Sequence, residues 1–121
     1  MSRLPTVILT TALLGTGLLA PSLGHAADDP AVGQMRQRLI QLQADPQTVD
    51  AAAYERLQAQ QAIDAFANAK RRDQELTRYL AERRVEIAET AARAQVARRE
   101  VDRLDQTRAE LLIEASRREA Q

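Results

Sequence analysis

The stretch AAAYERLQAQQAIDAFANAKRRDQELTRYLAERRVEIAETAARAQVARREVDRLDQTRAELLIEASRREAQ, residues 51–121, contains no glycine and no proline. Its main constituents are Ala, Arg, Gln, Glu and Leu, which favour helices because they lose little side-chain freedom there. A sheet would require turn residues that this stretch lacks. The sequence therefore predicts an all-α protein.

Apolar residues recur in this stretch with a heptad period. With the first core position set at Leu80, eight of ten a positions and six of ten d positions are apolar, and half of these fourteen residues are alanine. Alanines bury little area, so a lone helix of this kind would be marginal, and we expect it to associate. The partner could be the same chain folded back, another copy or a different protein. The larger apolar residues of this register form the predicted association seam: Phe66, Leu76, Leu80, Ile87, Val101, Leu104 and Leu111.

The cluster from Lys70 to Asp73 is the best candidate for a fold-back. Asp73 would place a charge on the seam, and its side chain could cap a new helix. The alternative is one uninterrupted helix of roughly 75 residues, about 110 Å long at 1.5 Å per residue. The absence of a glycine makes a tight reversal harder. The sequence leaves a hairpin and a continuous, coiled-coil-like helix both open.

Two Asp-Pro pairs divide the preceding residues. Asp29-Pro30 predicts a short helix from Pro30 to about Ala44, because the aspartate can cap free N–H groups while proline fits the first helical position. Asp45-Pro46 is expected to end this helix and open the next, with Asp50 as an alternative cap. We thus expect a short helix and linker over residues 27–50 and a long helical region over 51–121.

The first 26 residues resemble a secretory signal peptide. Arg3 precedes an uncharged run from Leu4 to Leu23, and small residues follow at Gly24 and Ala26. Cleavage after Ala26 is expected to release the rest of the chain into the periplasm of a Gram-negative cell. The alternative is an uncleaved anchor, which would add a membrane as partner.

The sequence contains no cysteine, so it predicts neither disulfides nor a lipid-modified N-terminus. The 17 basic and 17 acidic side chains balance, and this neutrality argues against a nucleic-acid partner.

Residues for catalysis are sparse. The single histidine, His25, lies in the expected signal peptide, and Ser116 is the one serine after it, with no base nearby. The carboxylates Glu82, Glu86 and Glu89 are interleaved with arginines and indicate a solvated surface. No glycine-rich phosphate loop occurs. We therefore expect no enzyme activity, no cofactor and no metal site.

Two segments carry a resemblance, YLAERRVEIAETAARAQ from Tyr79 to Gln95 and REVDRLDQTRAELLIEASRREAQ from Arg99 to Gln121. They resemble the helical region of Gram-negative envelope proteins grouped as domain of unknown function 4398. The similarity covers roughly Ala51 to Gln121. In some relatives this region lies ahead of a peptidoglycan-binding domain like that of outer-membrane protein A. The 121 residues include no such domain, and the family implies no site residues.

Taken together, these features predict a non-enzymatic exported helical protein of the cell envelope. A structural or scaffolding role would use the association seam, with the partner a second copy or an envelope protein. The alternative is a periplasmic chaperone or adaptor that binds clients between long helices.

Overall fold

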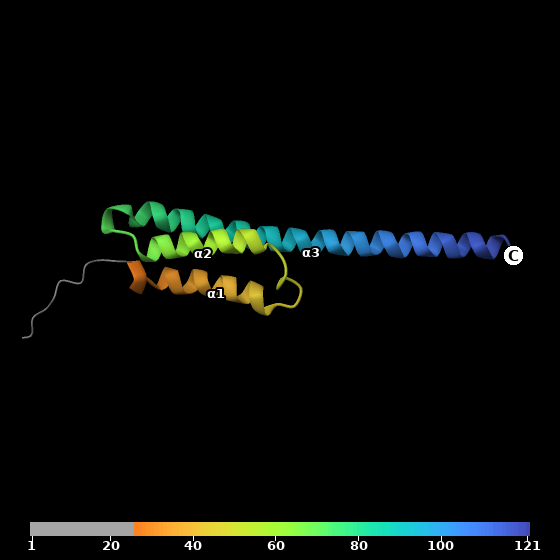
Figure 1. The fold of residues 1–121 in the computed structure, drawn as a ribbon, viewed down its shortest axis with the longest axis horizontal. Helices are drawn as coiled ribbons and strands as arrows, with labels where there is room; N and C mark the ends of the chain where they lie inside the picture. The colour runs from red at the N-terminus through yellow and green to blue at the C-terminus, as the bar shows by residue number, and fades with distance from the viewer. Residues whose placement is uncertain (1–25) are drawn as a thin grey trace, which may run out of the picture.

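The computed structural model describes residues 26–121, and these residues fold into helices without a strand (Figure 1). The predicted all-α class is therefore confirmed. Residues 1–25, which hold most of the expected signal peptide, lie outside the described residues. The elements are η1 (Ala26–Asp28), α1 (Pro30–Ala44), α2 (Ala53–Ala67), η2 (Arg71–Asp73) and α3 (Gln74–Glu119).

The three α-helices run up, down and up, so that α2 is antiparallel to its two neighbours (Figure 1). The first half of α3 packs against α1 and α2 to form a bundle. Residues 97–119 of the same helix continue beyond the bundle, and every side chain in this part is exposed. We call residues 97–119 the arm.

The start of α1 matches the prediction. The Asp29 carboxylate accepts a hydrogen bond from the Ala31 N–H at 2.8 Å, and Pro30 occupies the first turn. The helix ends at Ala44, as expected, because Asp45 is extended and Pro46 follows it.

The second Asp-Pro pair does not open α2, and that prediction is wrong. The Asp45 carboxylate accepts from the Gln47 N–H at 2.8 Å, which turns the chain into a loop instead of a helix. Asp50 is not the cap either, because α2 begins at Ala53 after the left-handed residue Ala52, whose φ is 52°. A contact from α3 supports this backbone: the Ala52 N–H donates to the Gln95 side-chain oxygen at 2.9 Å.

The chain does fold back where the cluster Lys70 to Asp73 lies, so the hairpin is present and the uninterrupted helix is not. Helix α2 ends at Ala67, and the Asn68 side-chain amide donates to the Asp64 carbonyl at 2.8 Å. Asp73 is the residue before α3, but its side chain makes no capping bond and instead accepts from Arg72 Nε at 3.3 Å. A single heptad frame therefore does not extend from α2 into α3.

The core lies between α1, α2 and the first half of α3. Its largest fully buried side chains are Phe66, Ile63, Val32 and Val85. Ala31, Met35 and Leu39 complete the buried contribution of α1. Burial of this apolar surface is the main stabilising term of the bundle.

Candidate interaction surface on α3

Helix α3 carries two apolar faces that point in opposite directions. The inner face consists of Ala81, Val85, Ala88 and Ala92, each fully buried. The first three lie in the core between the helices, and Ala92 packs against Ala51 and Ala52 at the end of the loop before α2. The helix turns about 100° per residue, which places Ala81 and Val85 about 100° and 140° round the axis from Leu80. The outer apolar residues therefore face away from the bundle.

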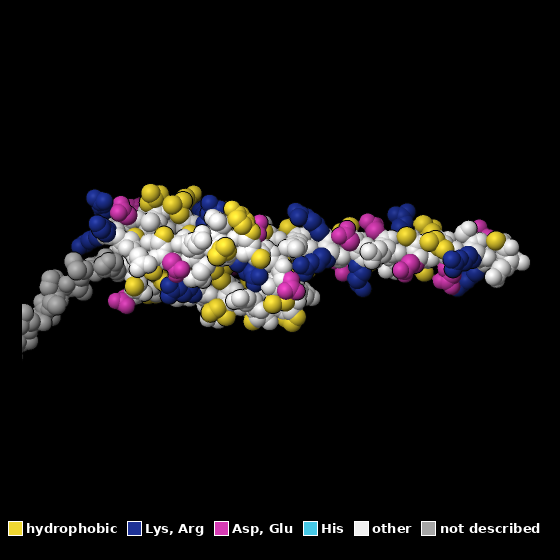
Figure 2. Space-filling view, viewed as in Figure 1, with side chains coloured by type: hydrophobic (Ala, Val, Ile, Leu, Met, Phe, Trp, Pro, Cys, Tyr) yellow, Lys and Arg dark blue, Asp and Glu magenta, His cyan; other side chains and the backbone are white. Residues whose placement is uncertain are grey.

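The outer face is an exposed stripe along α3. Its members are 48% to 62% exposed, and they extend from the bundle into the arm: Leu76, Leu80, Ile87, Val101, Leu104 and Leu111. In the view of Figure 2, hydrophobic side chains gather over the first half of α3 and recur along the arm. We call these six residues the outer stripe.

The inner face ends where the bundle ends, but the outer stripe does not. After Ala92, the positions that continue the inner face are occupied by Gln95, Arg99, Asp102 and Gln106. Over the same length the outer stripe retains large apolar residues. Between residues 95 and 106 the arm thus has large apolar residues on the outer side only, and this side is continuous with the outer face of the bundle.

Six of the seven predicted seam residues form the outer stripe. The seventh, Phe66, is 1% exposed and lies in the core of the bundle. The heptad frame placed Phe66 with Leu80 because it assumed one continuous helix. The break between Ala67 and Gln74 turns α2 back, so Phe66 faces the inner side of α3 instead.

A shallow groove crosses the outer face of α3. Its lining residues are Arg83, Glu86, Ile87, Thr90, Ala91 and Ala94. Residues spaced by three, four and seven positions on one helix form a hole that can receive one side chain of a facing helix. This groove contains two such holes in succession, one beginning at Arg83 and one at Ile87.

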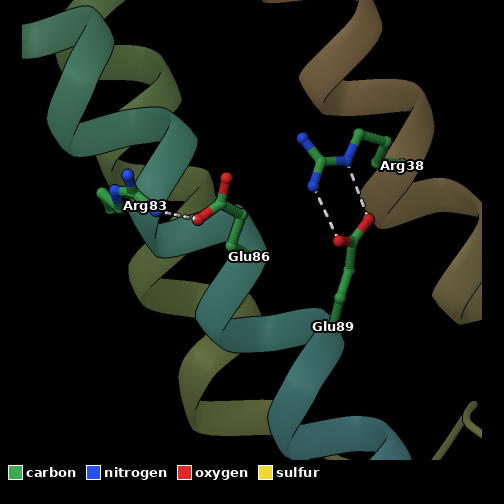
Figure 3. A network of polar contacts seen from close by, with 4 residues as sticks. All are labelled: Arg38, Arg83, Glu86 and Glu89. Atoms are coloured by element: carbon green, nitrogen blue, oxygen red, sulfur yellow. Dashed lines mark hydrogen bonds and ion pairs between the residues drawn. The ribbon is translucent and has the colours of Figure 1, made fainter.

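Charged groups on the two sides of α3 have different roles (Figure 3). On the outer side, Arg83 bonds Glu86 at 2.5 Å and lies 5.4 Å from the centre of the Tyr79 ring. On the side that faces α1, Arg38 binds Glu89 with two hydrogen bonds of 2.8 and 2.7 Å. The Arg38 guanidinium lowers the pKa of Glu89, chiefly by hydrogen bonding. This pair fixes α1 on α3 and leaves the outer stripe uncovered.

The carboxylates that could have served chemistry are engaged by arginines. Glu82 pairs with Arg78 at 3.0 Å, in addition to the pairs of Glu86 and Glu89 described above. Among residues 26–121, no group of three potential ligands could hold a metal ion. Ser116 is an exposed residue of the arm.

Two long-range contacts that hold the bundle together were not predicted from the sequence. The partners Arg38 and Glu89 lie 51 residues apart, and Gln95 reaches Ala52 across 43 residues. Neither pair has a local spacing that would indicate it. Glu114, by contrast, binds Arg118 four residues further along the same helix.

The fold and surface define an all-α protein, a three-helix bundle whose last helix extends as an arm. A comparison with protein-family models, curated proteins and solved structures found no match to this chain. The resemblance to domain of unknown function 4398 thus stays a prediction. Within the part of the chain that the structure describes, no helix has the length and apolarity needed to cross a membrane.

Proposed function

We propose that this protein is a non-enzymatic, exported helical protein of the Gram-negative cell envelope with a scaffolding role. In this proposal the bundle holds α3 in position, and the outer stripe binds a protein partner. The observation that carries it is the continuity of the stripe from Leu76 to Leu111 while the inner face stops at Ala92. An apolar stripe that outlasts the intramolecular core requires some other surface to cover it.

The chemistry of the described residues supports an interaction role. The mature chain would contain no histidine and no cysteine, and its clustered carboxylates are paired with arginines. Export itself rests on the residues up to Ala26. Ala26 is a buried residue of η1, and Ala27, which would begin the mature chain, is exposed. Fractionation of Gram-negative cells followed by N-terminal sequencing tests this part, with a periplasmic chain that begins at Ala27 as the expected result.

The association is tested in cells by cysteine cross-linking, which is clean because the chain has no cysteine of its own. Ser116→Cys in the exposed arm is labelled with a maleimide that carries a benzophenone, and light then bonds this group to any partner within reach, whether or not the partner has a thiol. We expect trapped species of higher mass that disappear when Leu80→Asp and Leu104→Asp are added. The matched control, Gln106→Asp with Ala109→Asp, adds two charges on the opposite side of the arm and should retain them. Equal trapping by both double variants would refute the scaffolding role.

A second candidate, a client-binding chaperone or adaptor, is favoured by one feature of the arm. Leu111, Leu112 and Ile113 are consecutive and each at least 53% exposed, which broadens the apolar surface near the end of α3. An aggregation assay with an unfolded outer-membrane protein separates the two functions. A chaperone suppresses aggregation at a stoichiometric ratio, whereas a scaffold has no effect.

A further inference from the structure

We propose that the outer stripe of α3 is covered by the same stripe of a second copy, with the two α3 helices antiparallel. This inference rests on the proposed scaffolding role and names its partner. The observations that select this occupant are the length of the stripe, the pairing of large with small side chains, and the charges that flank it.

The size of the surface fits a dimer of this chain. Two antiparallel α3 helices, 46 residues each, can overlap over almost their whole length. The contact would be about 65 Å long and about 10 Å wide at the helix geometry of 1.5 Å per residue. It would thus bury on the order of 650 Å² per copy, near the roughly 800 Å² per partner of a stable interface. The arm alone offers about half of this area.

One antiparallel alignment matches the side chains of the stripe. Placing Leu80 level with Leu111 of the second copy also brings Ile87 level with Leu104 and Leu76 level with Ala115. At the centre, Ala94 meets Ala97, where two small side chains let the helices approach closely. In this alignment Leu104 and Val101 of the second copy lie over the two holes of the groove. Each arm therefore covers the outer face of the other copy's bundle.

The bundle does not obstruct this arrangement. Helices α1 and α2 pack on the inner face of α3, where Ala81, Val85, Ala88 and Ala92 are fully buried. The second copy would lie on the opposite side of the helix. The inner side of each α3 helix, polar from Gln95 to Gln106, stays in solvent.

Flanking charges favour the antiparallel over the parallel orientation. In the antiparallel alignment Arg93 lies beside Glu100 of the second copy, and Arg84 lies beside Asp105. A parallel pair in register instead sets Arg93 against Arg98, Glu100 against Asp105 and Glu114 against Glu119. Flanking charges of this kind set the orientation of paired helices.

One layer of the antiparallel pair is unfavourable. Arg83 shares it with Arg108 of the second copy, and both carry a positive charge. The Arg83 guanidinium is bonded to Glu86 at 2.5 Å within its own chain, which offsets part of the repulsion. In a parallel pair, Arg83 would face Arg83 of the second copy in one layer, and Arg108 would face Arg108 in another.

Spin labels on introduced cysteines measure the orientation in the purified full chain. A label at Ser116→Cys would lie level with Glu75 of the second copy, so the two labels should be about 60 Å apart at 1.5 Å per residue. In a parallel pair they would be within about 25 Å. Arg98→Cys is the matched control, because it lies near the centre and gives a short distance in either orientation. A short Ser116 distance overturns the inference.

Charge exchange gives an independent test by sedimentation. Arg84→Asp or Asp105→Arg alone turns two attractive contacts into repulsive ones and should weaken the dimer about tenfold, whereas the double variant should restore it. In a parallel pair Asp105→Arg would instead relieve repulsion with Glu100 and tighten association. A chain that stays monomeric at every concentration also overturns the inference. If the cellular cross-links to Ser116→Cys persist in that case, the scaffolding role stands with a different partner.

Discussion

The two halves of α3 have similar compositions but very different surroundings. In the first half, Val85 and three alanines are fully buried, whereas all side chains of residues 97–119 are exposed. The difference comes from the inner face alone, which changes from small apolar residues to Gln95, Arg99 and Asp102. The outer stripe is common to both halves. The bundle therefore depends on one face of α3, and the proposed association depends on the other.

A charge placed on each face of α3 in turn should give the largest difference in stability. Val85→Asp would bury an unpaired carboxylate in the core, which should cost more than about 4 kcal/mol and unfold the bundle. Ile87→Asp, two residues away on the outer stripe, should change the unfolding free energy of the monomer by less than about 1 kcal/mol. Urea unfolding followed by circular dichroism at low protein concentration measures both. Similar losses for the two variants would contradict the assignment of the faces.

A smaller effect is expected at Gln95, where the inner face ends. Gln95→Ala would remove the acceptor of the Ala52 N–H and should reduce the unfolding free energy by about 1–3 kcal/mol. Gln95→Glu is the matched control, because it keeps an acceptor oxygen at the same position and should retain most of the stability. Thermal unfolding of the two variants is the measurement. Equal unfolding temperatures for the two variants would show that this contact does not support the left-handed Ala52.

The hydrogen bond from Ala52 to Gln95 also explains why one part of the fold could not be predicted from the sequence. Local signals predicted α1 correctly, because the Asp29 cap and Pro30 act within a few residues. The start of α2 was mispredicted at Asp45-Pro46, because it depends on Gln95, far along the chain. The prediction of the outer stripe was wrong at one residue for a similar reason. Its residues were predicted from periodicity, but Phe66 was included because the heptad frame could not register the reversal at residues 68–73.

The ion pair of Arg38 and Glu89 gives the contact between α1 and α3 a pH dependence. The pKa of Glu89 is lowered in the folded state, so its contribution is present above the ordinary carboxylate pKa of about 4.3 and is lost as the pH falls through the folded value. Glu89→Gln should cost about 1 kcal/mol at pH 7, since both side chains are partly exposed, and should flatten the decline of stability below about pH 4.5.

The control for this pH dependence is Glu110→Gln, the same change on the exposed arm. It removes one carboxylate without touching the bundle, so stability at pH 7 and its acid profile should match those of the unchanged chain. Denaturant titrations between pH 3 and pH 7 compare the variants. An acid profile of Glu89→Gln that is as steep as that of the unchanged chain would exclude a contribution from this pair.

Deletion of the arm should have the smallest effect on the stability of the bundle. Removing residues 97–121 takes away no buried side chain, because every residue in this range is exposed. At low protein concentration the Tm of the bundle should change by less than about 4 °C, the shift that corresponds to roughly 0.5–1 kcal/mol in a domain of this size. A much lower Tm in the dilute monomer would mean that the arm stabilises the bundle within one chain. A loss of stability that is seen only at high protein concentration would instead show that the arm stabilises the protein through contacts between copies.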